Sequence, residues 1–185
     1  MFLRLALHAA ALAASTALAQ PAPERFAIPQ HGTLLLNVPT DWRVADKATA
    51  NPPAVAVHLG PAATDSFDLQ LTAVWLEPAK RAEMTPQAIK ERVQATSKEL
   101  LKQAVEKDAP LSELRGKQAL GYYFSLSDRE SQNTGSDYRY IAEGTLAVGE
   151  VVVIFTFLHR EAGTPAKAQA LHVVSEAAWV PEQAR

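Results

Sequence analysis

The chain has 185 residues, enough for one domain with a sizeable hydrophobic core. Its 18 lysines and arginines and 20 aspartates and glutamates give a net charge of −2. Because nucleic-acid-binding proteins carry a clustered basic excess, this balance excludes a nucleic-acid partner. The chain also has no cysteine, which excludes disulfides, thiolate metal ligands and a lipid-bearing cysteine.

Residues 1–19 have the pattern of a secretory signal peptide. Arg4 is followed by an almost wholly apolar run, and Ala17-Leu18-Ala19 supplies a small-x-small cleavage pattern. We therefore expect cleavage before Gln20 and a soluble, monomeric mature protein in the periplasm or secreted, with no stable membrane anchor. The alternative is an uncleaved N-terminal anchor, which the shortness of the apolar run disfavours.

Residues 20–30 contain three prolines and are predicted to form an extended lead-in. Residues 31–181 are predicted to form a single α+β domain, and residues 182–185 a short tail. Strands are expected at 33–38, 42–44, 54–59 and 67–76. In the last of these, apolar and polar side chains alternate, with Asp68 and Gln70 on the polar face.

Two helices are predicted from Thr-Pro starts. Thr85-Pro86 begins a helix that extends to about Val105, with Ile89 and Val93 on its apolar stripe. A second helix covers residues 166–178 after Thr164-Pro165.

Between the helices, strands are expected at 111–114, 121–127 and 138–148. A polar loop at 128–137, centred on 132–136, joins the last two as a hairpin. Gly144 is interpreted as a bulge or bend in its strand.

Residues 151–158, Val-Val-Val-Ile-Phe-Thr-Phe-Leu, form the most apolar segment of the mature chain. They predict a central strand that is covered on both faces, because successive side chains point to opposite sides of a sheet. Short turns between neighbouring strands indicate antiparallel pairing. The predicted class is therefore α+β: one antiparallel sheet of about six to eight strands with two main helices.

The segment Gly32-Thr33-Leu34-Leu35-Leu36-Asn37-Val38-Pro39-Thr40-Asp41-Trp42 resembles the opening strand and Pro-x-x-Trp corner of the PsbP/Mog-like fold. The order of the later elements, from Phe26 to Trp179, is also similar to that family. The resemblance implies an α/β/α sandwich and a binding or assembly role, as in exported bacterial members of unknown function. It transfers no functional residue to this chain.

No catalytic motif is found. The sequence lacks a Gly-x-Ser-x-Gly elbow, and the mature chain's histidines, His31, His58, His159 and His172, lack metal-ligand spacing. Each histidine is interpreted as a surface or rim residue. No catalytic residue, metal or cofactor is predicted.

The candidate binding residues are Tyr123, Arg139, Gln70 and Asp68. If their strands pair through the 128–137 loop, they could share a polar, aromatic-lined patch for a small ligand or a protein partner. The alternative is that the tyrosines are ordinary cross-strand pairs of the sheet.

The sequence thus predicts an exported binding or accessory protein that contacts a protein or cell-envelope partner. The alternative is a hydrolase-like enzyme with a site built from scattered residues. A cleft that holds Tyr123, Arg139 and a carboxylate with a displaced pKa would favour that alternative.

Overall fold

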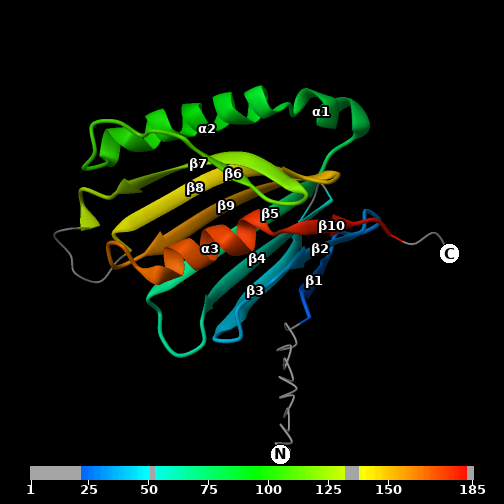
Figure 1. Ribbon diagram of the computed structural model, residues 1–185, viewed down its shortest axis with the longest axis horizontal. Helices are drawn as coiled ribbons and strands as arrows, with labels where there is room; N and C mark the ends of the chain where they lie inside the picture. The colour runs from blue at the N-terminus through cyan, green and yellow to red at the C-terminus, as the bar shows by residue number, and fades with distance from the viewer. Residues whose placement is uncertain (1–21, 51–52, 132–137, 183–185) are drawn as a thin grey trace, which may run out of the picture.

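Figure 1 shows the computed structural model, which describes residues 22–50, 53–131 and 138–182. The expected signal peptide at 1–19 and the centre of the expected hairpin loop at 132–136 lie outside the described residues. Within the described ranges, no helix has both the length and the apolar character needed to cross a membrane.

Seven antiparallel strands form the main sheet, in the order β3-β4-β5-β9-β8-β7-β6. Most of these strands were predicted from the sequence, so the α+β class is confirmed, but β3 continues to Ala50, well beyond the expected 42–44. The bounds are β3 Trp42–Ala50, β4 Ala54–Pro61, β5 Phe67–Trp75, β6 Ser112–Arg115, β7 Ala119–Ser127, β8 Tyr140–Val148 and β9 Val151–His159.

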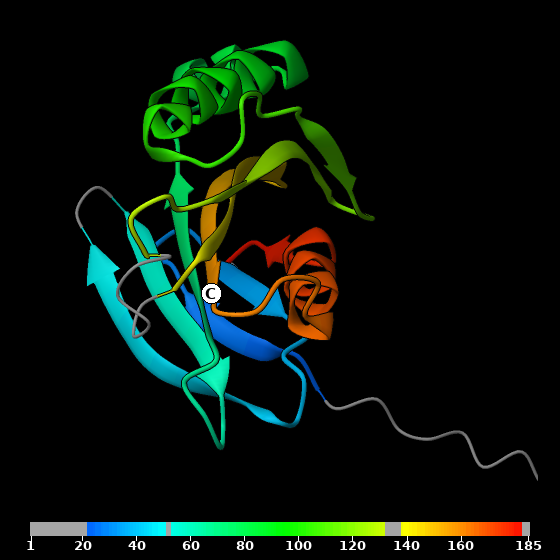
Figure 2. The same cartoon turned by 90° about the vertical axis from the view of Figure 1, so that its left-hand side faces the viewer.

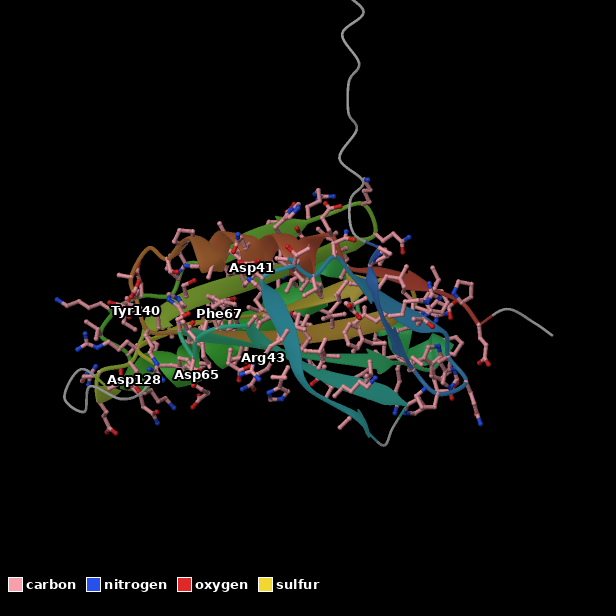
Figure 3. All side chains as sticks on the ribbon, turned by 90° about the horizontal axis from the view of Figure 1, so that it is seen from below. Asp41, Arg43, Asp65, Phe67, Asp128 and Tyr140 are labelled. Atoms are coloured by element: carbon pink, nitrogen blue, oxygen red, sulfur yellow. The ribbon has the colours of Figure 1, made fainter. Side chains whose placement is uncertain are left out.

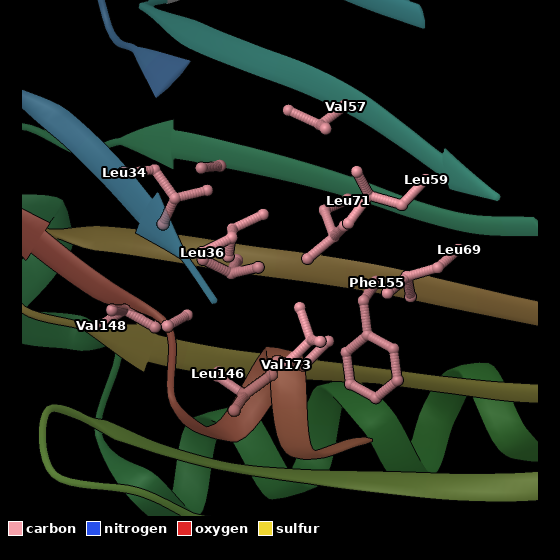
Figure 4. Close-up of a cluster of buried hydrophobic side chains, with 14 of the residues drawn as sticks. Leu34, Leu36, Val57, Leu59, Leu69, Leu71, Leu146, Val148, Phe155 and Val173 are labelled. Atoms are coloured by element: carbon pink, nitrogen blue, oxygen red, sulfur yellow. The ribbon is translucent and has the colours of Figure 1, made fainter. Parts of the chain in front are cut away.

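A second, three-stranded sheet has the order β1-β2-β10, with bounds β1 Glu24–Ala27, β2 Thr33–Leu36 and β10 Ala178–Val180. The prediction of a single sheet was therefore wrong. Strand β2 buries Leu34 and Leu36 completely, and they lie in one apolar cluster with Phe155 of the main sheet (Figure 4). Burial of this apolar face against the main sheet explains why β2 forms a separate layer.

Helices α2 and α3 begin where the Thr-Pro pairs predicted, whereas α1, which follows Glu77, was not predicted. Their bounds are α1 Pro78–Glu83, α2 Pro86–Leu100, the 3-10 turn η1 Leu101–Gln103 and α3 Pro165–Ser175. The Thr85 hydroxyl accepts a hydrogen bond from the backbone N–H of Ala88 at 3.2 Å, which caps the first turn of α2. Ile89 and Val93 are buried on the inner stripe of α2, as predicted.

The two long helices lie on opposite sides of the main sheet (Figure 2). Helix α2 packs on β7 and β8, where Ile89 and Val93 meet Phe124 and Leu126. Helix α3 and the small sheet cover the other face and enclose the larger apolar core.

Strand β9 lies at the centre of the main sheet, as predicted, but its two faces are not covered equally. The side chains of Val153, Phe155 and Phe157 point toward α3 and the small sheet and are fully buried. On the other face, Ile154, Thr156 and Leu158 are only half-buried. The prediction of full cover on both faces was wrong, because α2 lies over β7 and β8 rather than over β9.

Gly144 lies in β8 with unbroken register to β7 and β9, so the expected bulge is not formed. A glycine is required there by close packing. A Cβ at this position would lie 2.5 Å from the Tyr122 carbonyl oxygen and 2.7 Å from both Phe155 Cε1 and Tyr123 Cβ.

Substitution Gly144→Ala should destabilise the fold by about 1–3 kcal/mol, the usual cost of overpacking a rigid core. The matched control is Gly60→Ala in β4, where a new Cβ would lie 3.6 Å from the nearest atom, the Phe67 carbonyl oxygen. Urea unfolding of both variants checks this. Equal free energies of unfolding would show that the neighbours of Gly144 move aside without cost.

Candidate binding site

The half-covered face of the main sheet has a row of polar side chains. The strand register places Glu143 of β8 beside Thr156 of β9, Thr156 beside Gln70 of β5, and Gln70 beside His58 of β4. All four side chains are half-buried. Since neighbouring strands lie about 5 Å apart, the row offers a series of evenly spaced hydrogen-bonding groups to solvent.

Asp68 joins this row through two neighbours. Its Oδ2 accepts a hydrogen bond from Gln70 Nε2 at 2.7 Å and lies 3.7 Å from His58 Nδ1. Glu143 has no charged partner among the described residues, and burial raises the pKa of its carboxyl group.

A pocket of about 160 Å³ lies at one end of this face. It is formed between the end of α2 with η1 and the adjoining ends of β7, β8 and β9, and Figure 3 shows Asp128 and Tyr140 together at this end. Its interior is mostly apolar, and polar groups stand at its rim. The lining residues are Leu100, Gln103, Ala104, Leu126, Ser127, Asp128, Tyr138, Arg139, Tyr140, Ile141 and Leu158.

The pocket is continuous with the polar row, because Leu158 of its lining pairs in register with Asp68 on β5. Tyr138 spans the same junction. Burial raises the pKa of its hydroxyl, and the negative charge of Asp68 adds to this effect. The Arg160 guanidinium lies over the Tyr138 ring, 5.5 Å from its centroid.

Several hydrogen bonds hold the pocket wall in place. The Glu106 carboxylate accepts the Ser127 N–H at 2.8 Å and the Ser127 hydroxyl at 2.7 Å. Arg129 Nη2 donates to the Ala104 carbonyl oxygen at 2.6 Å, and Asp128 Oδ1 accepts the Glu130 N–H at 2.9 Å. The bonds of Glu106 and of Arg129 tie the segment after α2 to the end of β7, whereas the bond between Asp128 and Glu130 is local.

The structure brings together three of the four residues predicted for binding. Asp68 and Gln70 are hydrogen-bonded to each other, and Arg139 lines the adjoining pocket. Tyr123 lies on the opposite face, with its ring 6.5 Å from that of Phe155 in the main core. A shared patch of Tyr123 and Arg139 is therefore not formed, nor is the cleft that would have favoured an enzyme.

Sequence reasoning missed the apolar lining of the pocket. The polar loop at 128–137 was the available signal, because its two flanks supply Asp128 and Tyr138 to the pocket. In the sequence, the lining residues Leu126, Ile141 and Leu158 have the pattern of ordinary strand residues.

His159 is not a rim residue, which corrects the prediction. Its side chain is only 3% exposed and stacks between Tyr140 and Phe157, with ring centroids 5.1 and 5.0 Å away. Burial lowers the pKa of its imidazole, partly offset by the hydrogen bond to the Glu161 carbonyl oxygen. In the part of the chain that the structure describes, no group of three or more His, Cys, Asp or Glu residues could hold a metal ion.

No family model matches the chain, and no curated protein matches it significantly. Among solved structures, the chain is similar to a Bacteroides thetaiotaomicron protein of known crystal structure. The two chains superpose with a TM-score of 0.40 and share 9% sequence identity. The match covers 89% of this chain and 50% of that chain, so this chain spans about half the length of that protein.

The Glu106–Ser127 contact predicts an acid-dependent loss of stability at the pocket wall. Although partial burial acts to raise the Glu106 pKa, the hydrogen bonds from Ser127 hold it below the ordinary value of 4.5. A carboxyl group whose pKa is lower in the folded state stabilises the fold at pH values above its unfolded-state pKa. This contribution is lost as the pH falls through the folded-state pKa.

At neutral pH, Glu106→Gln should therefore cost about 1 kcal/mol, a low value for a charged hydrogen bond because the group is partly exposed. The difference from the unsubstituted protein should shrink as the pH falls below 4.5. Denaturant unfolding at several pH values checks this, with Glu130→Gln at an exposed position as the control. A difference that is constant with pH would contradict the proposed role of the carboxylate charge.

Proposed function

We propose that the chain is an exported, soluble binding or accessory protein that contacts a protein partner through the pocket and the polar row beside it. The observation that carries this proposal is an apolar pocket that opens directly onto a half-covered, polar sheet face. An apolar centre with a polar rim is the usual composition of a protein–protein contact.

The size of the pocket favours a protein partner over a drug-sized ligand. Small-molecule sites usually measure about 300–1,000 Å³, whereas this pocket measures about 160 Å³. An apolar cavity of about 150 Å³ accommodates one benzene molecule. The pocket is therefore suited to one aromatic or branched side chain, and single anchoring side chains in small pockets often dominate the affinity of protein interfaces.

We also propose that the fold is of the PsbP/Mog type, with an α/β/α sandwich. Two observations support this: α2 and α3 lie on opposite faces of the main sheet, and the Pro39–Trp42 corner is closed. The Trp42 N–H donates to the Pro39 carbonyl oxygen at 3.0 Å, and the buried Trp42 ring lies 4.5 Å from that of Phe67. A binding or accessory role agrees with the better-known members of that fold family.

Site-specific photo-crosslinking in the protein's own host tests the proposed contact. A p-benzoyl-phenylalanine residue in place of Gln103, which is exposed and lines the pocket, should give an adduct with one defined protein. The same residue in place of Gln94, exposed on α2, is the matched control and should give none. The charge reversal Arg139→Glu should weaken the adduct without changing the melting temperature. Equal adducts at the two positions would contradict a partner site at the pocket.

Export is tested separately by the intact mass of the protein from the host's exported fraction. We expect a chain that begins at Gln20, because cleavage after Ala19 follows the small-x-small pattern. A mass that retains residues 1–19 would support the N-terminal anchor instead.

A further inference from the structure

A second pocket, of about 230 Å³, lies on the side of the main sheet that carries α3 and the small sheet (Figure 2). Its walls come from the outer face of β2, the link between α3 and β10, and the turn between β6 and β7. Pro23, which precedes β1, also lines it. No residue lines both this pocket and the first one, so the two cavities are separate sites.

Close packing holds the walls of the second pocket in place. The β6–β7 turn lies directly against the end of α3, because a Cβ at Gly116 would overlap the Ser175 carbonyl oxygen. The Gln118 side-chain oxygen accepts the Trp179 N–H at 3.2 Å, which joins the same turn to β10. The pocket is therefore formed without a ligand, so little loss of conformational entropy opposes binding.

Two side chains of opposite charge line this pocket. Lys117 is exposed at the β6–β7 turn, and Glu176 is half-buried at the end of α3. Among the described residues, neither forms an ion pair, with the other or with a third group. A cation and an anion that line one cavity without pairing are suited to a ligand that carries both charges.

The position of Glu176 is unfavourable for a carboxylate when no ligand is bound. Glu176 is the C-cap of α3, where the helix dipole places partial negative charge. A carboxylate opposes the dipole there, whereas an ammonium group is attracted both by the dipole and by the carboxylate. Glu176 and the end of α3 together therefore favour an ammonium group.

The β6–β7 turn supplies the matching groups for a carboxylate. Lys117 has three N–H donors and a full positive charge. Gln118 uses its side-chain oxygen for the Trp179 N–H, which leaves its NH₂ group as a donor. An ammonium group and an amide can hold a carboxylate through charge-assisted hydrogen bonds.

We propose that the second pocket binds a free α-amino acid with an apolar side chain, such as leucine. Its ammonium group lies at Glu176, and its carboxylate lies at Lys117. Its side chain packs on Leu35 and Ala178, which pair in register on the outer face of the small sheet. This inference goes beyond the protein contact proposed above and does not depend on it.

The volume of the pocket agrees with a ligand of this size. An apolar cavity of about 150 Å³ holds one benzene molecule, so about 230 Å³ holds a molecule with about half as many atoms again, such as leucine. Sites for drug-sized ligands are larger, at about 300–1,000 Å³.

Isothermal titration calorimetry with L-leucine tests the inference. Leucine should bind at least about tenfold more tightly than 4-methylpentanoate, which lacks the ammonium group, or 3-methylbutylamine, which lacks the carboxylate. N-acetyl-leucine and leucine amide resemble the two ends of a polypeptide and should be weaker by a similar factor. They distinguish a free amino acid from the end of a chain.

Variants assign each charge of the ligand to one side chain. Lys117→Gln and Glu176→Gln should each weaken leucine binding about tenfold without lowering the melting temperature. Lys117→Gln should leave the affinity for 3-methylbutylamine unchanged, because that amine has no carboxylate to lose. For the same reason, Glu176→Gln should leave the affinity for 4-methylpentanoate unchanged. The matched controls are Lys98→Gln on α2 and Glu83→Gln on α1, both exposed and outside the pocket.

Three results would overturn the inference. These are no binding of leucine at millimolar concentration, equal binding of leucine and either singly charged analogue, and unchanged leucine affinity in both pocket variants. Tighter binding of N-acetyl-leucine or leucine amide than of leucine would also overturn it, because the ligand would then be the end of a polypeptide. None of these results changes the crosslinking expected at Gln103, which tests the first pocket.

Discussion

Strand β9 is apolar on both faces, so both faces must be shielded from water, and the layers of the fold follow from this requirement. One face is shielded completely, by α3 and by the small sheet that β2 completes. The other face is shielded only in part, because α2 packs on β7 and β8. The large apolar side chains at that helix contribute about 1.5–3 kcal/mol each when buried. The half-covered strip that remains contains both the polar row and the pocket.

Local chemistry made much of the fold predictable. The Thr-Pro pairs marked the starts of α2 and α3, and the alternation of residues 67–76 assigned Asp68 and Gln70 to one face. The second sheet was not predictable, because β10 has only three residues and pairs with β2, which lies near the opposite end of the sequence. Such pairing depends on tertiary packing, which local propensity does not report.

The site was predictable only in part, for a reason of register. Tyr123 pairs with Gly144, and Asp128 donates its N–H to the Arg139 carbonyl oxygen, so Tyr123 and Arg139 point to opposite faces of the sheet. A shift of one residue in a hairpin reverses the face of every side chain, and a long polar loop does not define that register. His159 was predicted at the rim because it ends a strand. The ring of Tyr140 stacks on it, and such packing from another strand is not visible in the sequence around His159.

The position of β2 between β1 and β10 affects how the molecule can be made. Trp179 pairs with Leu34 and donates its indole N–H to the His31 carbonyl oxygen at 2.8 Å, so the two ends of the domain complete each other. During synthesis, β1 and β2 therefore cannot form the complete small sheet until β10 has been made. Closure of such a long loop is slow, because its entropy is lost before the contacts form. A nascent chain with this topology cannot close its small sheet until residues 178–180 have left the ribosome.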